Sequence, residues 1–154
     1  MAEVLQGITY ARERLSAELA AEVFPLLEQH FKEIDAFQDE PLAPDWDKYY
    51  RAQASDLIRI YIARDASKKL LGYSVSFVDT DLHHCTRKCA RADVFYIDPT
   101  RRGFGFDFLL WCNEQLQAEG VKVDFQHIST VFDWGTMARR AGYEPVENVW
   151  AKVL

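Results

Sequence analysis

The sequence of 154 residues has little cysteine, with only Cys85, Cys89 and Cys112. An odd and small number of cysteines cannot build the disulfide framework on which many small secreted domains depend. We therefore expect a reducing, cytoplasmic setting. No apolar run approaches the ~20 residues that cross a bilayer, and no signal-peptide pattern begins the chain. These absences predict no membrane partner.

Positive charge is also scarce, with 18 Lys and Arg against 24 Asp and Glu and a formal net charge of -6 at pH 7. Nucleic acids are held chiefly through contacts between phosphates and basic side chains, so this balance argues against a nucleic-acid partner. It fits a cationic or neutral substrate better. The length predicts one domain spanning residues 1–154, and the content of 49% hydrophobic residues is that of a globular protein.

The N-terminal third has the apolar spacing of helices. Apolar residues recur at helical intervals up to Ile34, with Ser16 as a candidate N-cap. Pro25 interrupts the pattern and predicts two helices or a kink. After a loop, Asp45 can cap a short second helical segment.

From residue 57 the pattern alternates as in strands. Strands over 57–64, 70–78 and 90–97 are expected to form an antiparallel meander, with a polar connection over 79–88.

The remaining chain predicts a crossover. A helix follows the third strand, and then come a strand from 121 to 125, a helix over 131–141 and a last strand over 143–154. The fold class is therefore α/β, with a mixed sheet whose first half is antiparallel, a β-α-β crossover, and helices on both faces.

The most informative segment is 94–110, V-F-Y-I-D-P-T-R-R-G-F-G-F-D-F-L-L, which reads as a strand, a tight turn and a helix start. Free backbone N–H groups and the helix dipole favour an anion at such a turn. The adjacent Arg101 and Arg102 add donors suited to phosphate. The segment therefore predicts a phosphate-bearing ligand.

Two well-known phosphate motifs do not fit this turn. A dinucleotide-binding fingerprint needs a third glycine, and a P-loop needs Gly-Lys followed by Ser or Thr. Gly103 and Gly105 alone are not specific, because a helix start that needs positive φ or close packing also uses glycine.

The block 96–105, Y-I-D-P-T-R-R-G-F-G, resembles the acyl-CoA motif of the GCN5-related N-acetyltransferases (GNAT), Arg/Gln-x-x-Gly-x-Gly/Ala. Of the three specified positions of this motif, Arg102 takes the first and Gly105 the second. Asp107 takes the third, where a small residue is expected. Further segments are similar, in order, to a phage and prophage branch of the family. They are residues 25–34, 44–50, 71–73, 93–96 and 140–147.

The resemblance implies an enzyme that transfers an acetyl or other acyl group from acetyl-CoA, its co-substrate, directly to an amine of a small molecule or a protein. It implies that the backbone of Phe95, Tyr96 and Ile97 pairs with the pantetheine arm. It also implies that the turn holds the pyrophosphate. The residues of that turn are Arg101, Arg102, Gly103, Phe104, Gly105 and Phe106.

An amine nucleophile must lose a proton. Asp93 is the first candidate base, because it is on the strand expected beside the thioester. It is expected to share a face of that strand with Phe95 and Ile97. The alternative is a carboxylate that is solvated or ion-paired and has no role in catalysis. His84 is the second candidate, because histidine titrates near neutral pH, and an ordinary loop histidine is its alternative.

Many relatives have a tyrosine general acid at the position that Ala138 takes in this sequence. Tyr96 or a water would have to replace it, or the thiolate would leave unassisted. The missing tyrosine and Asp107 favour an alternative function, a weak or inactive GNAT-fold protein that binds CoA or a partner protein.

His30 and Glu33 lie three apart on one helix face and are candidates for acceptor binding or proton relay. Trp46 and Tyr50 are expected to wall the same cleft or pack beneath it. For all four, an ordinary solvated or core position is the alternative.

The run His83-His84-Cys85-x-x-x-Cys89 has metal-binding residue types, but adjacent ligands and the lack of a second pair at the usual spacing predict no metal site. A last strand carrying Val146 and Trp150 could pair between subunits, which makes a homodimer an expectation of the sequence.

Overall fold

The computed structural model describes residues 7–34 and 40–154. A five-stranded sheet in the order β1-β2-β3-β4-β5 forms the middle layer. Neighbouring strands pair antiparallel from β1 to β4, and β5 is parallel to β4, which confirms the predicted mixed sheet. The strands are β1 (Thr9–Glu13), β2 (Ile58–Arg64), β3 (Leu70–Asp81), β4 (His84–Ile97) and β5 (Val123–Phe125).

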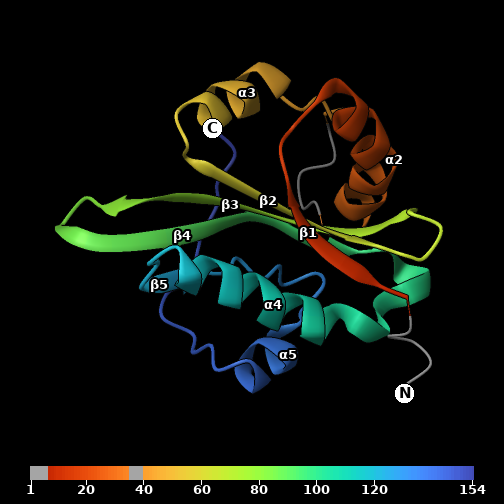
Figure 1. The fold of residues 1–154 in the computed structure, drawn as a ribbon. Helices are drawn as coiled ribbons and strands as arrows, with labels where there is room; N and C mark the ends of the chain where they lie inside the picture. Colours follow the sequence, from red (N-terminus) through yellow and green to blue (C-terminus); the bar gives the residue numbers. More distant parts are fainter. Residues whose placement is uncertain (1–6, 35–39) are drawn as a thin grey trace.

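Helices cover both faces of the sheet, as predicted (Figure 1). One face carries α2 (Ala17–Ile34) and α3 (Trp46–Ala54), and the other carries α4 (Gly105–Ala118) and α5 (Gly135–Arg140). A 3-10 turn, η1 (Pro99–Phe104), joins β4 to α4. Among the residues described, no helix has both the length and the apolarity to cross a membrane.

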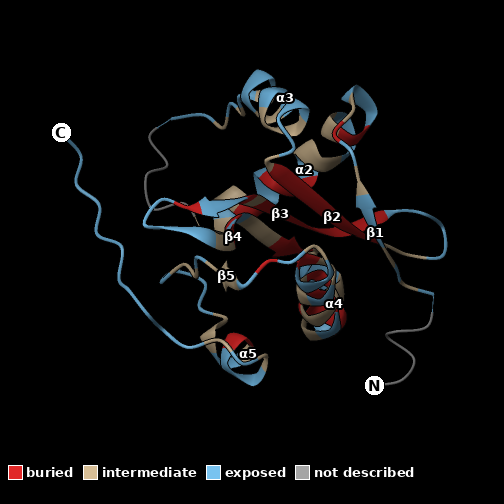
Figure 2. Cartoon of the chain, turned by 60° about the vertical axis from the view of Figure 1, so that its left-hand side comes forward, coloured by how far each residue is buried: buried red, intermediate tan, exposed pale blue. Residues whose placement is uncertain are grey.

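The sheet separates two apolar cores. Leu19, Ile60 and their neighbours fill the space beneath α2 and α3, while Phe104 and Phe108 belong to the core beneath α4. Figure 2 shows the buried residues concentrated on the central strands and on the inner side of α4. The sheet is therefore covered on both sides along the strands that position the site.

The predicted helix caps are present. The Ser16 hydroxyl accepts the Leu19 N–H at 3.1 Å, and the Asp45 carboxylate accepts the Lys48 N–H at 2.9 Å. The sequence predicted two helices or a kink at Pro25. Two helices are not found, because α2 continues through Pro25, and the kink stays a prediction. A proline removes one backbone hydrogen bond, and residues buried on both sides of Pro25, such as Leu19, hold the helix to the sheet.

The polar connection predicted over 79–88 is wrong. β3 and β4 remain paired through Thr80↔Lys88, and only a tight turn separates them. The Asp81 carboxylate fixes that turn by accepting the His83 N–H at 2.8 Å and an Arg87 N–H at 2.6 Å. The polar residues mark a hairpin end open to solvent, not a loop.

The sequence missed β1 and overestimated the C-terminal elements. β1 lay within the third of the chain expected to be helical, because its charged residues leave little apolar alternation. The helix expected over 131–141 begins only at Gly135. Residues 143–154 form no helix or strand, so the expected last strand is absent, and the segment is almost wholly exposed.

Candidate functional site

β4 and β5 separate along the sheet and leave part of β4 unpaired. They are paired only from Cys89↔Val123 to Arg91↔Phe125, although β4 continues to Ile97. From residue 92 to 97, the side of β4 that would face β5 has no strand partner within the described ranges 7–34 and 40–154. An open strand edge of this kind can pair with an extended ligand.

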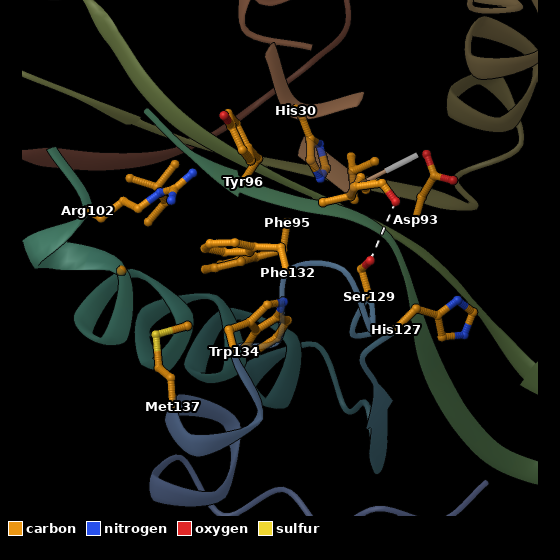
Figure 3. A pocket seen from close by; sticks show the side chains of 14 residues that line it. His30, Asp93, Phe95, Tyr96, Arg102, His127, Ser129, Phe132, Trp134 and Met137 are labelled. Carbon is orange, nitrogen blue, oxygen red and sulfur yellow. Dashed lines mark hydrogen bonds between the residues drawn. The ribbon is translucent and has the colours of Figure 1, made fainter. Parts of the chain in front are cut away.

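A pocket of about 170 Å³ lies along this unpaired part of β4 (Figure 3). Its walls come from α2, β4, the turn after β4, and the chain after β5. The lining residues are His30, Ile34, Asp93, Val94, Phe95, Tyr96, Ile97, Arg102, Gly105, His127, Ser129, Phe132, Trp134 and Met137.

The three strand residues expected to hold a pantetheine arm, Phe95, Tyr96 and Ile97, all line the pocket. Their side chains alternate across the sheet. Phe95 stacks against Phe108 of α4, with ring centroids 5.8 Å apart, whereas Tyr96 stacks against His30 of α2. The strand backbone therefore lies between two packed aromatic layers.

Asp93 lies at a β-bulge. Val75 of β3 is opposite Val94, and the next residue of β3 is opposite Ala92, which leaves Asp93 without a partner in the register. A bulge bends the strand locally and redirects a side chain, and bulges are common beside active sites.

The bulge places Asp93 on a different face from the one predicted. Its carboxylate accepts a hydrogen bond from the hydroxyl of Tyr49 on α3, whereas Phe95 and Ile97 pack toward α4. The expectation that Asp93 shares their face is wrong, because the extra residue changes the strand's alternation. Burial and the Asp93 carboxylate raise the pKa of Tyr49, so at neutral pH its hydroxyl keeps its proton.

His30 is buried, with 4% of its surface exposed. Its Nδ1 lies 2.9 Å from the Tyr73 hydroxyl, and its ring stacks on Tyr96 with centroids 4.4 Å apart. Burial lowers the pKa of His30 to about 4, the nearby Glu33 opposing and Arg102 reinforcing this shift. At neutral pH His30 is therefore an uncharged member of the pocket wall.

Glu33 connects α2 to the turn after β4. Its carboxylate accepts the Tyr96 hydroxyl at 2.6 Å and forms an ion pair with Arg102. The Arg102 guanidinium also lies over the Phe132 ring, 4.4 Å from its centroid. Burial and the Glu33 carboxylate raise the pKa of Tyr96 to about 12. A residue predicted for the acceptor and one predicted for the cofactor are thus in direct contact.

The turn presents an anion-binding arrangement with fewer side chains than predicted. Arg102 and Gly105 line the pocket, and Phe104, at the N-cap of α4, makes no side-chain cap bond. A Cβ on Gly105 would come within 3.0 Å of Ile97 Cδ1. The Gly105 N–H already donates to the Arg102 carbonyl. The groups of this turn that suit a phosphate are therefore the Arg102 guanidinium and the N–H groups that follow Gly105 in the first turn of α4.

The other predicted turn residues do not line the pocket. Phe104 is fully buried in the core beneath α4, and the Phe106 ring lies under Arg140 at 4.7 Å. Neither Arg101 nor Gly103 is among the lining residues.

Asp107 is not an obstacle to phosphate binding. It is exposed in the first turn of α4 and does not line the pocket, and a carboxylate is favourable near a helix N-terminus. An alternative register of the motif places Thr100 at the Arg/Gln position and Gly103 and Gly105 at the glycine positions. In that register Asp107 lies outside the motif.

His84 lies outside the pocket. It is exposed at the far end of the β3–β4 hairpin, where its Nδ1 is 3.4 Å from the Asp81 carboxylate. At about 3.3 Å per residue, His84 and Asp93 are separated by roughly 30 Å along β4. This position removes His84 from the candidate bases.

Trp46 and Tyr50 do not wall the predicted cleft. They line a separate groove between α2 and α3, together with Phe24. It is Tyr49 that reaches β4, through its hydrogen bond to Asp93. Helical geometry turns successive residues by about 100°, so neighbouring tyrosines face different surfaces.

The chain between β5 and α5 supplies a pocket wall that the sequence did not predict. The lining residues from this segment are His127, Ser129, Phe132 and Trp134. Figure 3 shows the His127 ring turned away from Phe132 and Trp134. The Ser129 hydroxyl lies 3.5 Å from the Ile34 carbonyl, which joins the wall to α2. The only sequence signal was an aromatic pair two residues apart, within a region assigned to a helix.

Ala138 is buried in α5, and its methyl group has no proton to donate. Within the part of the chain that is described, no group of three or more His, Cys, Asp or Glu side chains could hold a metal ion. Cys85, Cys89 and Cys112 are free thiols.

No protein-family model and no curated protein sequence matches this chain. Solved structures do. An aminoglycoside acetyltransferase, meta-AAC0020, from an uncultured soil metagenomic sample, superposes with a TM-score of 0.73 over 98% of this chain and 99% of that chain, at 14% identity. The chain has the fold of the GNAT acetyltransferases.

Two further structures support the assignment of the GNAT fold. Glucosamine-6-phosphate N-acetyltransferase from Arabidopsis thaliana has a TM-score of 0.68 at 11% identity, covering 94% of this chain and 98% of that chain. A predicted acetyltransferase from Clostridium acetobutylicum, solved with acetyl-CoA, has a TM-score of 0.66 at 14% identity, covering 96% of each chain. In this chain, the open edge of β4 and the turn at Arg102 border the same pocket.

Proposed function

We propose that the protein is an N-acetyltransferase that moves an acetyl group from acetyl-CoA directly to an amine. The observation that carries the proposal is the unpaired part of β4, from 92 to 97, which ends at the Arg102 turn and the uncapped start of α4. The likeness in fold to several acetyltransferases, one of them solved with acetyl-CoA, supports it.

The residues present fit acetyl-CoA. The free N–H and C=O groups of the β4 edge suit the amides of a pantetheine arm, and Arg102 and the N–H groups that follow Gly105 in the first turn of α4 suit the pyrophosphate. Arg102 pairs with Glu33 in this structure, so the proposed binding replaces one carboxylate partner of the guanidinium by phosphate.

Acetyl-CoA supplies an activated acetyl group as a thioester. The chain must bind the acceptor and remove its ammonium proton. We propose Asp93 as the group that accepts this proton, with its carboxylate held by Tyr49. His127, which lines the same pocket (Figure 3), is a second candidate base.

We propose a small cationic amine as the acceptor, with a protein amino group as the alternative. The Asp93 carboxylate lines the pocket, and the chain carries a net charge of -6. Proteins of similar structure include an aminoglycoside acetyltransferase and a ribosomal-protein-alanine N-acetyltransferase. The sequence resemblance supports further proposals. We propose that the chain is a single domain, that it belongs to the phage and prophage branch, and that the protein acts in the cytoplasm.

Two measurements, made one after the other, test this function. Acetyl-CoA should raise the melting temperature of the protein, and thiol release should then appear with aminoglycosides or with peptides that begin with alanine. No stabilisation by millimolar acetyl-CoA would contradict the proposal. Stabilisation without thiol release for any amine would favour the second function, that of a protein that binds CoA or a partner protein. Ala138, which is buried at the position of the tyrosine acid of many relatives, also favours this second function.

A further inference from the structure

The pocket wall that follows β5 is a loop whose two ends are joined by one side-chain contact. The hydroxyl of Tyr143 is hydrogen-bonded to the carboxyl group of Asp124 on β5, and the Tyr143 N–H donates to the Ala138 carbonyl of α5 at 3.0 Å. The pocket residues between these two ends are His127, Ser129, Phe132, Trp134 and Met137. The contact between Asp124 and Tyr143 therefore closes the loop and holds α5 to the sheet.

The Asp124 side chain lies on the face of the sheet that carries α4 and α5 (Figure 1). Asp124 is opposite Ala90 of β4, which belongs to the core beneath α4, and side chains on one face of a strand alternate with those on the other. Burial raises the pKa of Asp124, while its hydrogen bonds to Tyr143 and Gln126 act in the opposite direction. The net result is a carboxyl group that keeps its proton to a higher pH than an exposed aspartate does.

The groups around Asp124 supply no positive charge within the described ranges 7–34 and 40–154. Its titratable neighbours are Cys112 of α4 and Tyr143, and burial raises the pKa of both, so both are uncharged at neutral pH. Lys88, on the same face of β4, directs its ammonium group to the Glu119 carbonyl at 3.1 Å. A buried carboxylate without a cation is unfavourable, and the usual remedy is protonation.

The hydrogen bonds around Asp124 need one more proton than a carboxylate provides. The single hydroxyl proton of Tyr143 faces two acceptors, Asp124 Oδ2 and, at 2.8 Å, Asn113 Oδ1. Turning the Asn113 amide, so that its nitrogen donates to Tyr143, removes this conflict. A second conflict remains, because two buried oxygens, Asp124 Oδ1 and Gln126 Oε1, have no hydrogen-bond partner in the described part of the chain.

A proton on Asp124 Oδ1 removes the second conflict. The Gln126 Nε2 amide already donates to Asp124 Oδ2 at 2.8 Å, and an acid proton on Oδ1 can donate to Gln126 Oε1, as in an acid–amide pair. We infer that Asp124 is a carboxylic acid in this conformation and that, in this form, it positions the pocket wall by holding Tyr143 and Gln126. This role does not depend on which ligand the pocket binds.

Loss of that proton at higher pH is expected to loosen the wall. The proton leaves to solvent, and Asp124 Oδ1 and Gln126 Oε1 then remain as two buried acceptors without a donor, beside a charge without a cation. The loop relieves both by opening to water, which frees α5 from the sheet. The wall should therefore be closed below the pH at which Asp124 titrates and looser above it.

Carboxyl-carbon NMR and amide hydrogen exchange on the full chain, from pH 4 to pH 9, test this inference. Asp124 should be protonated at pH 5, unlike an ordinary aspartate with a pKa of ~3.9. As it ionises, the opening of the wall should increase about tenfold or more. The amides of Ala138 and Tyr143 measure this opening after correction for the intrinsic effect of pH on exchange, and the amides of β2 and β3 should stay protected. An Asp124 already ionised at pH 5, or an ionisation that leaves the wall unchanged, would overturn the inference.

Three variants separate this positioning role from a general contribution to stability. Asp124→Asn keeps one acceptor and gains one donor, as the acid has, so its wall should stay closed up to pH 9. Asp124→Ala can hold neither Tyr143 nor Gln126, and its wall should be open at every pH. Asp107→Asn removes an exposed carboxylate of α4 and, as the matched control, should behave as wild type. A wall that loosens with pH in Asp124→Asn, or one that stays closed in Asp124→Ala, would show that Asp124 does not hold it.

Discussion

The hydroxyl of Tyr49 on α3 donates a hydrogen bond to the carboxylate of Asp93, which the β4 bulge turns toward it. This contact joins the helical layer to the part of β4 where the strand leaves β5. It fixes the orientation of the carboxylate that we propose as the proton acceptor.

Replacing Asp93 by Asn tests that role. The amide keeps the shape of the side chain but cannot take a proton at neutral pH, so kcat should fall by about 10²–10⁴-fold, the usual contribution of a general base. Thiol release with saturating acetyl-CoA measures the effect. Tyr49→Phe should reduce kcat less, since it removes only the hydrogen bond that holds the carboxylate.

Tyr50→Phe is the matched control, because Tyr50 lies on the neighbouring groove between α2 and α3. It should leave kcat unchanged. If His127→Gln, and not Asp93→Asn, lowers kcat to the extent expected of a general base, the proton acceptor is His127 and the assignment to Asp93 is contradicted.

His30 predicts a pH dependence of stability. Burial lowers its pKa to about 4, whereas the unfolded chain has the ordinary value of ~6.5. Between these values the unfolded state binds more protons, so His30 stabilises the fold fully above about pH 6.5 and less as the pH falls toward 4. The free energy of unfolding from urea titrations should drop by about 2 kcal/mol from pH 7 to pH 5.

His30→Gln removes the titrating ring and should flatten this dependence. Glu33, whose pKa is lowered by its hydrogen bonds to Tyr96 and Arg102 against the effect of burial, titrates below its ordinary value and so outside the window. An equally steep loss of stability in the variant would show that another group is responsible.

Two glycines are expected to respond differently to alanine. A Cβ on Gly72 would lie 2.9 Å from the Tyr96 carbonyl oxygen, and a backbone atom in a sheet cannot move aside. Gly72→Ala should therefore destabilise the protein by about 1–3 kcal/mol. A Cβ on Gly105 meets only the ends of side chains, Ile97 Cδ1 at 3.0 Å and Met137 Sδ at 3.7 Å, so Gly105→Ala should change stability less.

The measurements are urea unfolding and acetyl-CoA binding on both variants. Because Gly105 lines the pocket, its variant should lose affinity for acetyl-CoA at nearly unchanged stability. Equal losses of stability in the two variants would contradict the packing argument.

The sequence predicted the antiparallel meander of β2, β3 and β4, the crossover to β5 and the strand that lines the pocket because those features depend on local patterns. Alternation between apolar and polar residues identified β2, β3 and the inner part of β4, and glycines with flanking arginines identified the turn. Backbone hydrogen bonding needs no apolar residue, so the polar end of the β3–β4 hairpin and the charged strand β1 were missed.

The site was less predictable because its details depend on single residues in three dimensions. The bulge in β4 directs the Asp93 side chain to the face of the sheet that carries α3. On α3, Tyr49 contacts β4, and not its neighbour Tyr50, which the sequence had suggested. The wall at His127 and Phe132 is irregular chain and has no periodicity to recognise.

Calorimetric titration of acetyl-CoA into wild-type protein, Arg102→Ala and Arg101→Ala tests the central claim most directly. The pair is matched, since both arginines lie in the turn but only Arg102 lines the pocket. Wild-type protein should bind, Arg102→Ala should bind about tenfold or more weakly through the loss of charge-assisted bonds to phosphate, and Arg101→Ala should bind almost as wild type. Absence of binding heat in the wild type, or equal losses in both variants, would contradict the acetyl-CoA site.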